Sequence, residues 1–252
     1  MFERFAKVFR NQTAVVVGAG GIGYEIAAQL VETGATVVVA DRRLDQLERY
    51  AALAERFPCI ARPLDVCDHE AVDSFFEELS ASIGPPRFLF YTAGILTIEP
   101  LSETSEADWL KAVDINLNGV FRCVRSVSRS MMESRRGSIL LLGSIAGTKA
   151  RSGSRVNPVY NSTKAAVSAF VNAAAMQLRP YGVRINCISP GPTETSMMNV
   201  QPPLVHEAVK QIALDGRMNS PAEVAELALF VAGHGRFTGE DVGMGGGAGL
   251  GG

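Results

Sequence analysis

The chain has 252 residues, of which 47% are hydrophobic and 20% are charged, and its formal net charge is −2. This length and composition fit one α/β domain with a large core, and the small net charge gives no reason to expect nucleic acid or an anionic membrane as a partner. The four cysteines form no Cys-x-x-Cys pair and the three histidines are scattered, so no metal or dithiol redox site is predicted. Residues 1–10 lack the apolar run of a signal peptide and no apolar stretch reaches membrane-spanning length, so we expect a cytoplasmic protein.

Short apolar runs alternate with longer amphipathic segments along the chain. The apolar runs predict strands at Ala14–Val17, Thr36–Ala40, Cys59–Leu64, Phe88–Tyr91, Ser138–Leu142, Arg184–Ile188 and Asp241–Met244. The amphipathic segments predict helices at Ile22–Thr33, Leu44–Arg56, His69–Ile83, Ala107–Ser134, with a break near Asn116–Gly119, and Val159–Arg179. This alternation predicts a doubly wound α/β fold, in which helices cover both faces of a parallel sheet.

No linker-like composition divides the chain, so we expect a single domain over residues 1–252. Within it we expect a cofactor half at about 1–150 and a substrate half at about 151–245. The Gly-rich stretch at 245–252 is predicted to be a flexible tail.

A glycine-rich segment, residues 18–23, follows the first predicted strand and opens the first helix. It fits Gly-x-Gly-x-x-Gly, in which Gly18 allows a tight turn, Gly20 lets the backbone approach a pyrophosphate, and Gly23 lets helix and strand pack closely. The helix N-terminus offers free N–H groups and a partial positive charge to phosphates. We therefore predict a dinucleotide site at this turn that also includes Gly21 and Ile22. No Gly-Lys-Ser/Thr is present, which excludes the phosphate loop of a nucleotide triphosphatase.

Asp41 ends the second predicted strand, where a carboxylate can accept hydrogen bonds from the adenosine ribose. Its charge would repel a 2′-phosphate, since two unit charges about 4 Å apart near a protein surface interact at roughly 4 kcal/mol before screening. Arg42 and Arg43 act in the opposite sense, because either can bind a 2′-phosphate, although exposed residues at a helix start explain them equally well. The sequence thus favours NAD and leaves NADP open.

Tyr160 and Lys164 lie four residues apart in a predicted helix, so the phenol and the ammonium share one face. A free tyrosine has a pKa of about 10, and a nearby fixed cation favours the phenolate and lowers that pKa towards the working range. Such a pair can exchange a proton with a substrate. Tyrosine and lysine also meet at this spacing by chance, so the remaining motifs decide what the pair means.

Polar residues and turns follow several of the predicted strands. Asp65 and Val66 follow the third strand, Ser144 follows the fifth, Pro190-Gly191-Pro192-Thr193 follows the sixth, and Asn116 lies in the long helix between strands four and five. A cap or a Pro/Gly turn explains each of them alone. These motifs occur in a fixed order along the chain, together with the glycine turn, Tyr160 and Lys164. In this order they resemble the motifs of the short-chain dehydrogenase/reductase family, and the resemblance covers nearly the whole chain.

The resemblance implies a Rossmann-type fold and a set of site residues. Asn116, Ser144, Tyr160 and Lys164 are similar to the family's catalytic tetrad. The resemblance also implies contacts to the cofactor. At the glycine turn and the acid after strand two these are Gly18, Gly20, Gly21, Ile22, Gly23, Asp41 and Arg42. The remaining contacts are Asp65 and Val66 at the adenine, Thr92, Ala93 and Gly94 in a segment that resembles Asn-Asn-Ala-Gly, Tyr160 and Lys164, and Pro190, Gly191 and Thr193 on the nicotinamide side.

The implied reaction is hydride transfer between NAD(H) and a secondary alcohol or ketone, with Tyr160 as general acid/base. In this scheme Lys164 lowers the Tyr160 pKa and hydrogen-bonds the nicotinamide ribose. Ser144 hydrogen-bonds the substrate oxygen, and Asn116 holds a water that links Lys164 to solvent. The resemblance also implies a homotetramer or homodimer.

Four departures from the family pattern stand out. The glycine turn is one residue shorter than usual, Thr92 replaces an asparagine, residues Arg151–Asn157 form an insertion before Tyr160, and Met244-Gly245-Gly246-Gly247 replaces Val-Asp-Gly-Gly. An NADPH-dependent ketoreductase of an acyl or polyketide pathway and a redox-silent NAD-binding sensor or scaffold are the alternatives. The apolar segment Glu194–Asp215 is expected to cover the substrate site, and the sequence does not identify the substrate.

Overall fold

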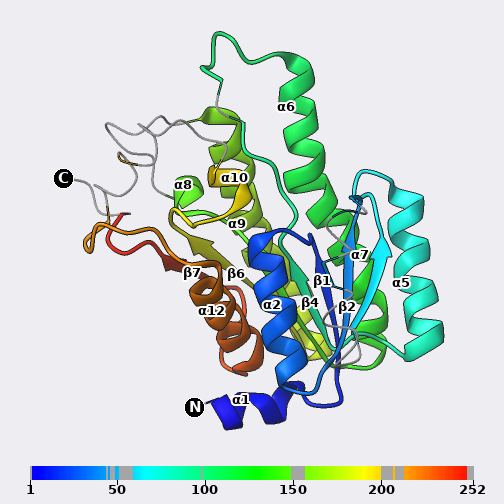
Figure 1. Cartoon of the computed structure of the whole chain (residues 1–252). Helices are drawn as coiled ribbons and strands as arrows, with labels where there is room; N and C mark the ends of the chain where they lie inside the picture. The colour runs from blue at the N-terminus through cyan, green and yellow to red at the C-terminus, as the bar shows by residue number, and fades with distance from the viewer. Residues whose placement is uncertain are drawn as a thin grey trace.

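The computed structural model of the chain describes residues 2–43, 45, 49–50, 59–97, 99–148, 157–199, 207 and 213–248. Its centre is a seven-stranded sheet in the order β3-β2-β1-β4-β5-β6-β7, with every neighbouring pair parallel (Figure 1). The strands are β1 (Thr13–Val17), β2 (Thr36–Asp41), β3 (Cys59–Pro63), β4 (Phe88–Tyr91), β5 (Gly137–Leu142), β6 (Val183–Pro190) and β7 (Asp241–Met244). The strand order reverses between β1 and β4, the point at which such sheets bind ligands outside their carboxyl ends. The predicted doubly wound fold is confirmed.

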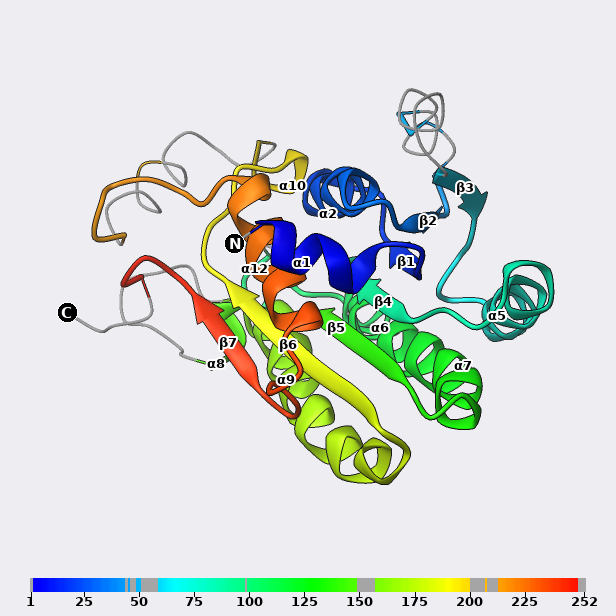
Figure 2. The ribbon, with the colours of Figure 1, turned by 90° about the horizontal axis from the view of Figure 1, so that it is seen from below.

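Helices cover both faces of this sheet (Figure 2). One face carries α1 (Phe2–Phe9), α2 (Gly21–Glu32) and α12 (Pro221–Gly233), and the other carries α5 (His69–Ile83), α7 (Gly119–Glu133) and α9 (Pro158–Leu178). Alternate residues of each strand enter the two cores. Val15 and Val17 are buried with α5, α7 and α9, whereas Ala14 and Val16 are buried with α2 and α12. Because both faces are covered, the strands are nearly continuous apolar runs, which is why the sequence identifies them.

A π-helical turn, Asp114–Asn118, joins α6 (Glu106–Val113) to α7. It lies where the long predicted helix was expected to break. A π-helical turn is rare and frequently lies at a functional site, because it alters the direction of the side chains that follow it. The shorter elements are α8 (Ile145–Thr148), α10 (Ser196–Asn199) and a 3₁₀ turn at Arg179–Tyr181.

Among the helices that the structure describes, the short helices α8 and α10 and the longer helices α1 and α12 were not predicted from the sequence. Residues 221–233 are apolar almost all round, so they lack the one-sided periodicity that predicts a helix. The start signals were nevertheless present, since Ser220 and Glu223 form a capping box and Pro221 occupies the first helical position. The predicted helix Leu44–Arg56 lies mostly outside the described residues, as does the predicted insertion apart from Asn157.

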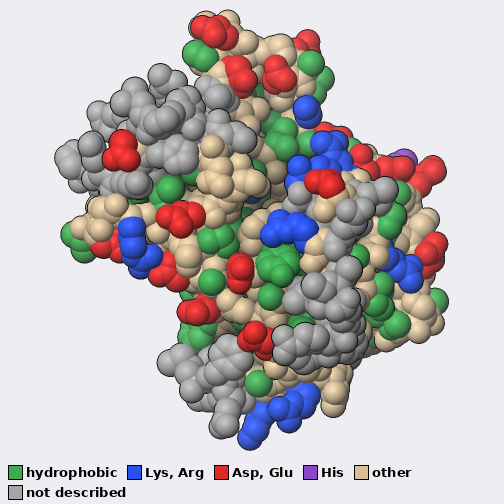
Figure 3. All heavy atoms as spheres, viewed as in Figure 1, with side chains coloured by type: hydrophobic (Ala, Val, Ile, Leu, Met, Phe, Trp, Pro, Cys, Tyr) green, Lys and Arg blue, Asp and Glu red, His purple; other side chains and the backbone are tan. Residues whose placement is uncertain are grey.

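The structure describes the first residues of the Gly-rich C-terminal segment. Residues 245–248, expected to begin a flexible tail, form a turn in which the Ala248 N–H donates to the Gly245 carbonyl at 2.8 Å and the Ala248 side chain is fully buried. The last residues, 249–252, lie outside the described part of the chain. Within the described ranges no helix has both the length and the apolar character needed to cross a bilayer. On the face seen in Figure 3, basic and acidic side chains form small groups that alternate with one another.

Candidate active site

A cleft of about 800 Å³ lies at the carboxyl ends of the strands. Every predicted site residue except Asn116 lines it: Gly18, Gly20, Gly21, Ile22, Gly23, Asp41, Arg42, Asp65, Val66, Thr92, Ala93, Gly94, Ser144, Tyr160, Lys164, Pro190, Gly191 and Thr193. These residues come from the loops that follow six different strands and from helix α9. The tertiary structure therefore brings the predicted dinucleotide turn and the predicted proton-exchanging pair into one cavity.

The glycine turn has the backbone that its sequence predicts. Gly18 has φ 101°, and a Cβ there would lie 2.4 Å from the Ala93 nitrogen. A Cβ at Gly23 would lie 1.9 Å from the Gly18 carbonyl oxygen, so both positions require glycine. Gly20 differs, because a Cβ there would have no atom within 4 Å. Gly20 is the N-cap of α2 and no side chain caps the helix, so the N–H groups of the first turn face open space in the cleft.

Thr92 ties β4 to this turn. Its hydroxyl donates to the Gly18 carbonyl at 2.8 Å and also lies 3.2 Å from the Val17 carbonyl. The backbone N–H groups of Thr92 and Ala93 both donate to Val17 as well. The threonine that replaces the family's asparagine thus keeps β4 attached to the glycine turn.

Asp41 holds the other side of the turn. One carboxylate oxygen accepts a hydrogen bond from the Ala19 N–H at 2.8 Å, and the other accepts from the Arg43 N–H at 2.9 Å. Each oxygen can accept a further bond, so the carboxylate is fixed in place and still able to bind a hydroxyl group in the cleft. Arg42 and Arg43 are exposed and line the same part of the cleft.

The Asp65–Val66 turn is fixed from two directions. The Asp65 carboxylate accepts from the Cys67 N–H at 2.9 Å, and the Val66 carbonyl accepts from the Arg122 guanidinium at 3.0 Å. Arg122 also forms an ion pair with Asp114 at 2.8 Å. The loop after β3 is therefore held against α7 and the π-helical turn.

Tyr160 lies in the first turn of α9, with its phenol hydrogen-bonded to the Ser144 side chain at the end of β5. Burial raises the pKa of Tyr160, and the Ser144 hydrogen bond partly offsets this by lowering it. Lys164 Nζ donates to the Leu142 carbonyl at 2.7 Å, and burial lowers the Lys164 pKa to about 8.

The net shift of the Tyr160 pKa is upward although Lys164 lies on the same face of α9, and the expectation that Lys164 lowers this pKa stays a prediction. Burial acts on both groups and disfavours the charged form of each, so the pKa of Tyr160 rises while that of Lys164 falls. The ammonium is also bonded to a backbone carbonyl rather than to the phenol. Ser144 is the neighbour whose contact favours the phenolate.

Asn116 lies behind the cleft rather than in its wall. It is 1% exposed and lies in the π-helical turn, where its Oδ1 accepts from the Ile95 N–H at 2.8 Å. Its Nδ2 donates to the Ile95 carbonyl at 3.0 Å and to the Thr163 hydroxyl at 3.1 Å. Both amide hydrogens are thus used within the protein, and only Oδ1 has capacity left for a further donor such as water.

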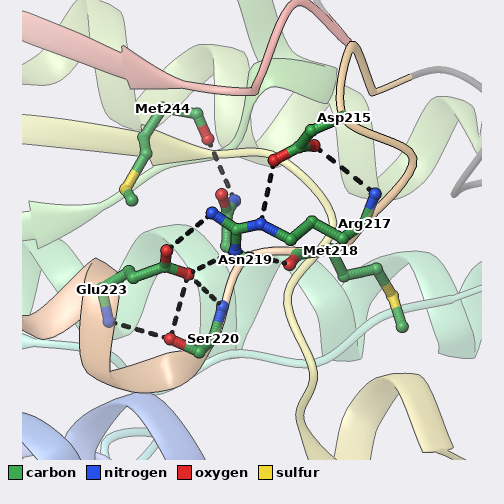
Figure 4. A network of polar contacts seen from close by, with 7 residues as sticks. All are labelled: Asp215, Arg217, Met218, Asn219, Ser220, Glu223 and Met244. Atoms are coloured by element: carbon green, nitrogen blue, oxygen red, sulfur yellow. Dashed lines mark hydrogen bonds and ion pairs between the residues drawn. The ribbon is translucent and has the colours of Figure 1, made fainter.

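The loop after β6 is held by Asn219, which lies just before α12 and whose side-chain bond to Met244 is drawn in Figure 4. The Asn219 backbone N–H donates to the Pro192 carbonyl at 2.8 Å, and its carbonyl accepts from the Glu194 N–H at 2.9 Å. Its side chain donates to the Met244 carbonyl at 3.1 Å, which also accepts from the Gly191 N–H at 2.7 Å. The loop that contains Gly191 and Thr193 is thereby joined to the end of β7.

Arg217 joins the segment before Asn219 to the start of α12. The Arg217 guanidinium pairs with Asp215 at 2.9 Å and with both oxygens of Glu223, at 2.8 and 2.9 Å (Figure 4). Glu223 in turn accepts from the Ser220 N–H at 2.8 Å, which caps α12. Because of the Arg217 contact, with the Ser220 bonds adding to it, the Glu223 pKa is lowered to about 2.

Comparison with known proteins agrees with this geometry. A family model described as enoyl-(acyl carrier protein) reductase, one of the short-chain dehydrogenase/reductase models, matches residues 17–248. The galactitol 2-dehydrogenase of Rhizobium johnstonii is 36% identical over 230 residues, which are 88% of each chain. The 2-dehydro-3-deoxy-L-rhamnonate dehydrogenase (NAD(+)) of a Sphingomonas species is 30% identical over 230 residues, 90% of each chain. The crystal structure of gox2181 superposes with a TM-score of 0.90 at 28% identity and covers 98% of this chain and 99% of that one.

The chain belongs to the short-chain dehydrogenase/reductase family. The family is one of NAD(P)-dependent oxidoreductases, and the named relatives are dehydrogenases that act on CH–OH groups, so the chain is an enzyme of this class. The redox-silent alternative considered from the sequence is thereby set aside.

Several cleft residues of this dehydrogenase/reductase were missed by the sequence prediction. They are Ile95, Leu96, Thr97, Ile145, Ala146, Asn157 and Asn161 among others. Met197 and Met198 also line the cleft, and they lie in the segment that was expected to cover the substrate. Asn157 carries a signal only as a helix-start residue, and Asn219 precedes the cap residue Ser220. Nothing in the local sequence of either asparagine indicates the distant segments that it contacts.

Proposed function

We propose that this protein interconverts a secondary alcohol and its ketone with NAD(H), using Tyr160 as the general acid/base. The observation that carries the proposal is the shared cleft: the Tyr160 phenol and Ser144 line the same cavity as the open N-terminus of α2 and the Asp41 carboxylate. A proton-exchanging side chain and a site for a dinucleotide phosphate are the two requirements of this chemistry.

The residues around the glycine turn fit a dinucleotide. The uncapped first turn of α2 and the open space beside Gly20 suit a pyrophosphate, and Asp41 suits the adenosine ribose. The adenine would contact Asp65 and Val66. The middle of the cofactor would lie beside Thr92, Ala93 and Gly94. The nicotinamide side would be held by Pro190, Gly191 and Thr193. When bound, the nicotinamide supplies the acceptor or donor of the hydride at its C4 atom.

The protein's own side chains handle the proton. For alcohol oxidation, Tyr160 as phenolate takes the proton of the substrate hydroxyl, and the Ser144 hydroxyl donates a hydrogen bond to the same oxygen. For ketone reduction, the Tyr160 hydroxyl gives its proton to the carbonyl oxygen. Lys164 supplies a positive charge one turn along α9, and Asn116 holds Ile95 and Thr163 in place behind it.

NAD is the proposed cofactor because the Asp41 carboxylate is fixed in the cleft wall by the Ala19 and Arg43 N–H groups. A fixed negative charge disfavours a 2′-phosphate more strongly than a side chain that can turn away. Arg42 and Arg43 also line the cleft and favour the second candidate, an NADPH-dependent ketoreductase. The ratio of kcat/KM values with the two cofactors separates the candidates.

The experiment that tests the proposal is an oxidation assay in which reduced cofactor is followed by its absorbance. A panel of polyols and other secondary alcohols is offered with NAD or NADP, and Tyr160→Phe is the matched control. Two galactitol 2-dehydrogenases, 36% and 32% identical, are among the relatives, so polyols are tested first. Turnover that is faster with NADP would favour the ketoreductase, and turnover that survives in Tyr160→Phe would contradict the role of the phenol.

Assembly, location and the internal division of the chain stay predictions. We propose a homotetramer or homodimer, which is supported by exposed apolar side chains on α6 and α7: Trp109 at 42%, Leu110 at 56% and Phe121 at 50% exposure. Light scattering after size-exclusion chromatography measures this directly. The division into a cofactor half at about 1–150 and a substrate half at about 151–245, and the cytoplasmic location, keep the status of expectations from the sequence.

A further inference from the structure

Asn157 begins the helix that contains Tyr160. Its Oδ1 accepts a hydrogen bond from the backbone N–H of Tyr160 itself at 2.8 Å, and Pro158 occupies the first helical position after it. The side chain is almost fully buried, with the residue 7% exposed, and it lines the cleft. The cap therefore acts directly on the residue whose phenol exchanges the proton.

The same amide also binds the segment that follows β4. The Thr97 hydroxyl donates to Asn157 Oδ1 at 2.9 Å, and Asn157 Nδ2 donates to the Glu99 carbonyl at 3.1 Å. Ile95, Leu96 and Thr97 form part of the cleft wall. A single buried amide thus joins the start of the Tyr160 helix to one wall of the cavity.

A second asparagine, Asn116, also joins the cleft wall to α9, about one helical turn further along that helix. Asn116 binds both backbone groups of Ile95 and donates to the Thr163 hydroxyl on α9. Thr163 in turn donates to the Tyr160 carbonyl at 2.8 Å. The wall at 95–97 is consequently attached to α9 at two levels, and the Tyr160 backbone is bonded at both its N–H and its carbonyl.

We propose that Asn157 is a positioning residue of the reaction, which sets the Tyr160 phenol against the substrate-facing wall formed by Ile95, Leu96 and Thr97. A substrate that packs on this wall then meets the phenol at a distance determined by the Asn157 bonds. Small displacements of a reacting group cost large factors in rate, so these bonds affect turnover more than binding of the cofactor. The inference rests on the proposed function of Tyr160.

The cap is an amide rather than a carboxylate, and this difference bears on the phenol. Tyr160 lies in the first turn of α9, where the partial positive charge of the helix N-terminus favours the phenolate. The groups that face the phenol are the Ser144 hydroxyl from the end of β5 and Lys164 on α9, with the Cys187 thiol of β6 behind Lys164. A carboxylate at position 157 would place a negative charge within one helical turn of the phenol. Helix α5 has such a cap in Asp68, which does not itself line the cleft.

Four variants test the proposal. Asn157→Ala removes the cap and both bonds to the wall, and Asp68→Ala is the matched control, because Asp68 caps α5 by accepting from Glu70 and Ala71. We expect similar losses of thermal stability in the two variants. Only Asn157→Ala should lower kcat, by about tenfold or more, with the dissociation constant for NAD within about twofold of the wild-type value.

Asn157→Asp keeps the cap acceptor and loses the donor to Glu99. Because the cap acceptor is kept, its thermal stability should exceed that of Asn157→Ala, but the loss of the buried bond to Glu99 should place it below wild type. The negative charge should raise the Tyr160 pKa, so the acidic limb of kcat/KM for alcohol oxidation should move up by about half to one pH unit. Thr97→Val removes only the hydroxyl on the wall, and it should raise the substrate KM without moving this limb.

Wild-type kcat and pH profile in Asn157→Ala, an unmoved acidic limb in Asn157→Asp, or an equal loss of kcat in Asp68→Ala would each overturn the positioning role. Tyr160→Phe separates this result from failure of the proposed function. If that variant is inactive while Asn157→Ala behaves as wild type, only the positioning role is lost. If Tyr160→Phe itself turns over, the proposed function falls first.

Discussion

Lys164 Nζ lies 5.7 Å from the centre of the Tyr160 ring, one turn along the same helix, and its hydrogen bond goes to the Leu142 carbonyl. The phenol instead contacts Ser144. The two groups share a face of α9, as their spacing predicts, yet the surrounding elements determine their protonation. Burial raises the pKa of Tyr160 and lowers that of Lys164 to about 8.

Tyr160→Phe should lower kcat by about 10²–10⁴-fold, the usual contribution of a general acid/base, while NAD still binds. The substitution removes one hydroxyl and leaves the ring in place, so thermal stability should change little. Turnover is measured by absorbance of reduced cofactor, and binding is measured by fluorescence titration. Residual activity within tenfold of wild type would show that another group exchanges the proton.

The Lys164 charge should produce a pH dependence near its lowered pKa. Below about pH 8 the ammonium is protonated and favours the phenolate, and above that pH the charge is lost, so kcat/KM should fall on the alkaline side. Lys164→Arg keeps a cation that stays protonated over the whole working pH range and should move this alkaline limb upwards. Lys164→Met should lower kcat/KM mainly below about pH 8, where the wild-type ammonium is charged. An alkaline limb that is identical in wild type and Lys164→Arg would assign the limb to a different group.

Asp41→Ala should narrow the preference for NAD over NADP by about tenfold, which corresponds to about 1.4 kcal/mol, because the charge that opposes a 2′-phosphate is removed. The variant also frees the Ala19 and Arg43 N–H groups, so the KM for NAD should rise. Arg42→Ala is the matched control and should weaken only NADP. The comparison uses kcat/KM values for both cofactors at fixed ionic strength, and an unchanged cofactor ratio in Asp41→Ala would contradict the assignment.

Gly18→Ala should mainly lower the stability of the fold, whereas Gly20→Ala should mainly weaken binding of the cofactor. Gly18 has φ 101° and its added Cβ would meet Ala93, so alanine there should destabilise the fold by about 1–3 kcal/mol from backbone strain alone. Gly20 has an ordinary φ of −70° and open space around it, so alanine there should cost less than about 1 kcal/mol. Its methyl group should nevertheless weaken NAD binding by about tenfold, since it occupies the place where the backbone approaches the pyrophosphate.

Thermal unfolding and fluorescence titration measure the two effects separately. The opposite outcome, in which Gly20→Ala binds NAD as wild type does, would move the phosphate site away from the start of α2.

The strands and most helices could be predicted because each depends on residues close together in the chain. Val15 and Val16 face opposite cores, and both are apolar because helices cover both faces of the sheet. Helix α12 escaped because it is apolar nearly all round, so its face towards the sheet has no contrasting polar face in the sequence.

By itself, the sequence determined the order of the motifs: a glycine turn after β1, an acid after β2, and Tyr160 one turn before Lys164. Each is a short-range pattern whose geometry follows from backbone sterics and helical spacing. Only the tertiary structure decided that Asn157 joins Tyr160 to Thr97, that Asn219 joins Pro192 to Met244, and that burial raises the Tyr160 pKa. The partners of these groups lie far away in the chain, and the burial of a side chain depends on every element packed around it.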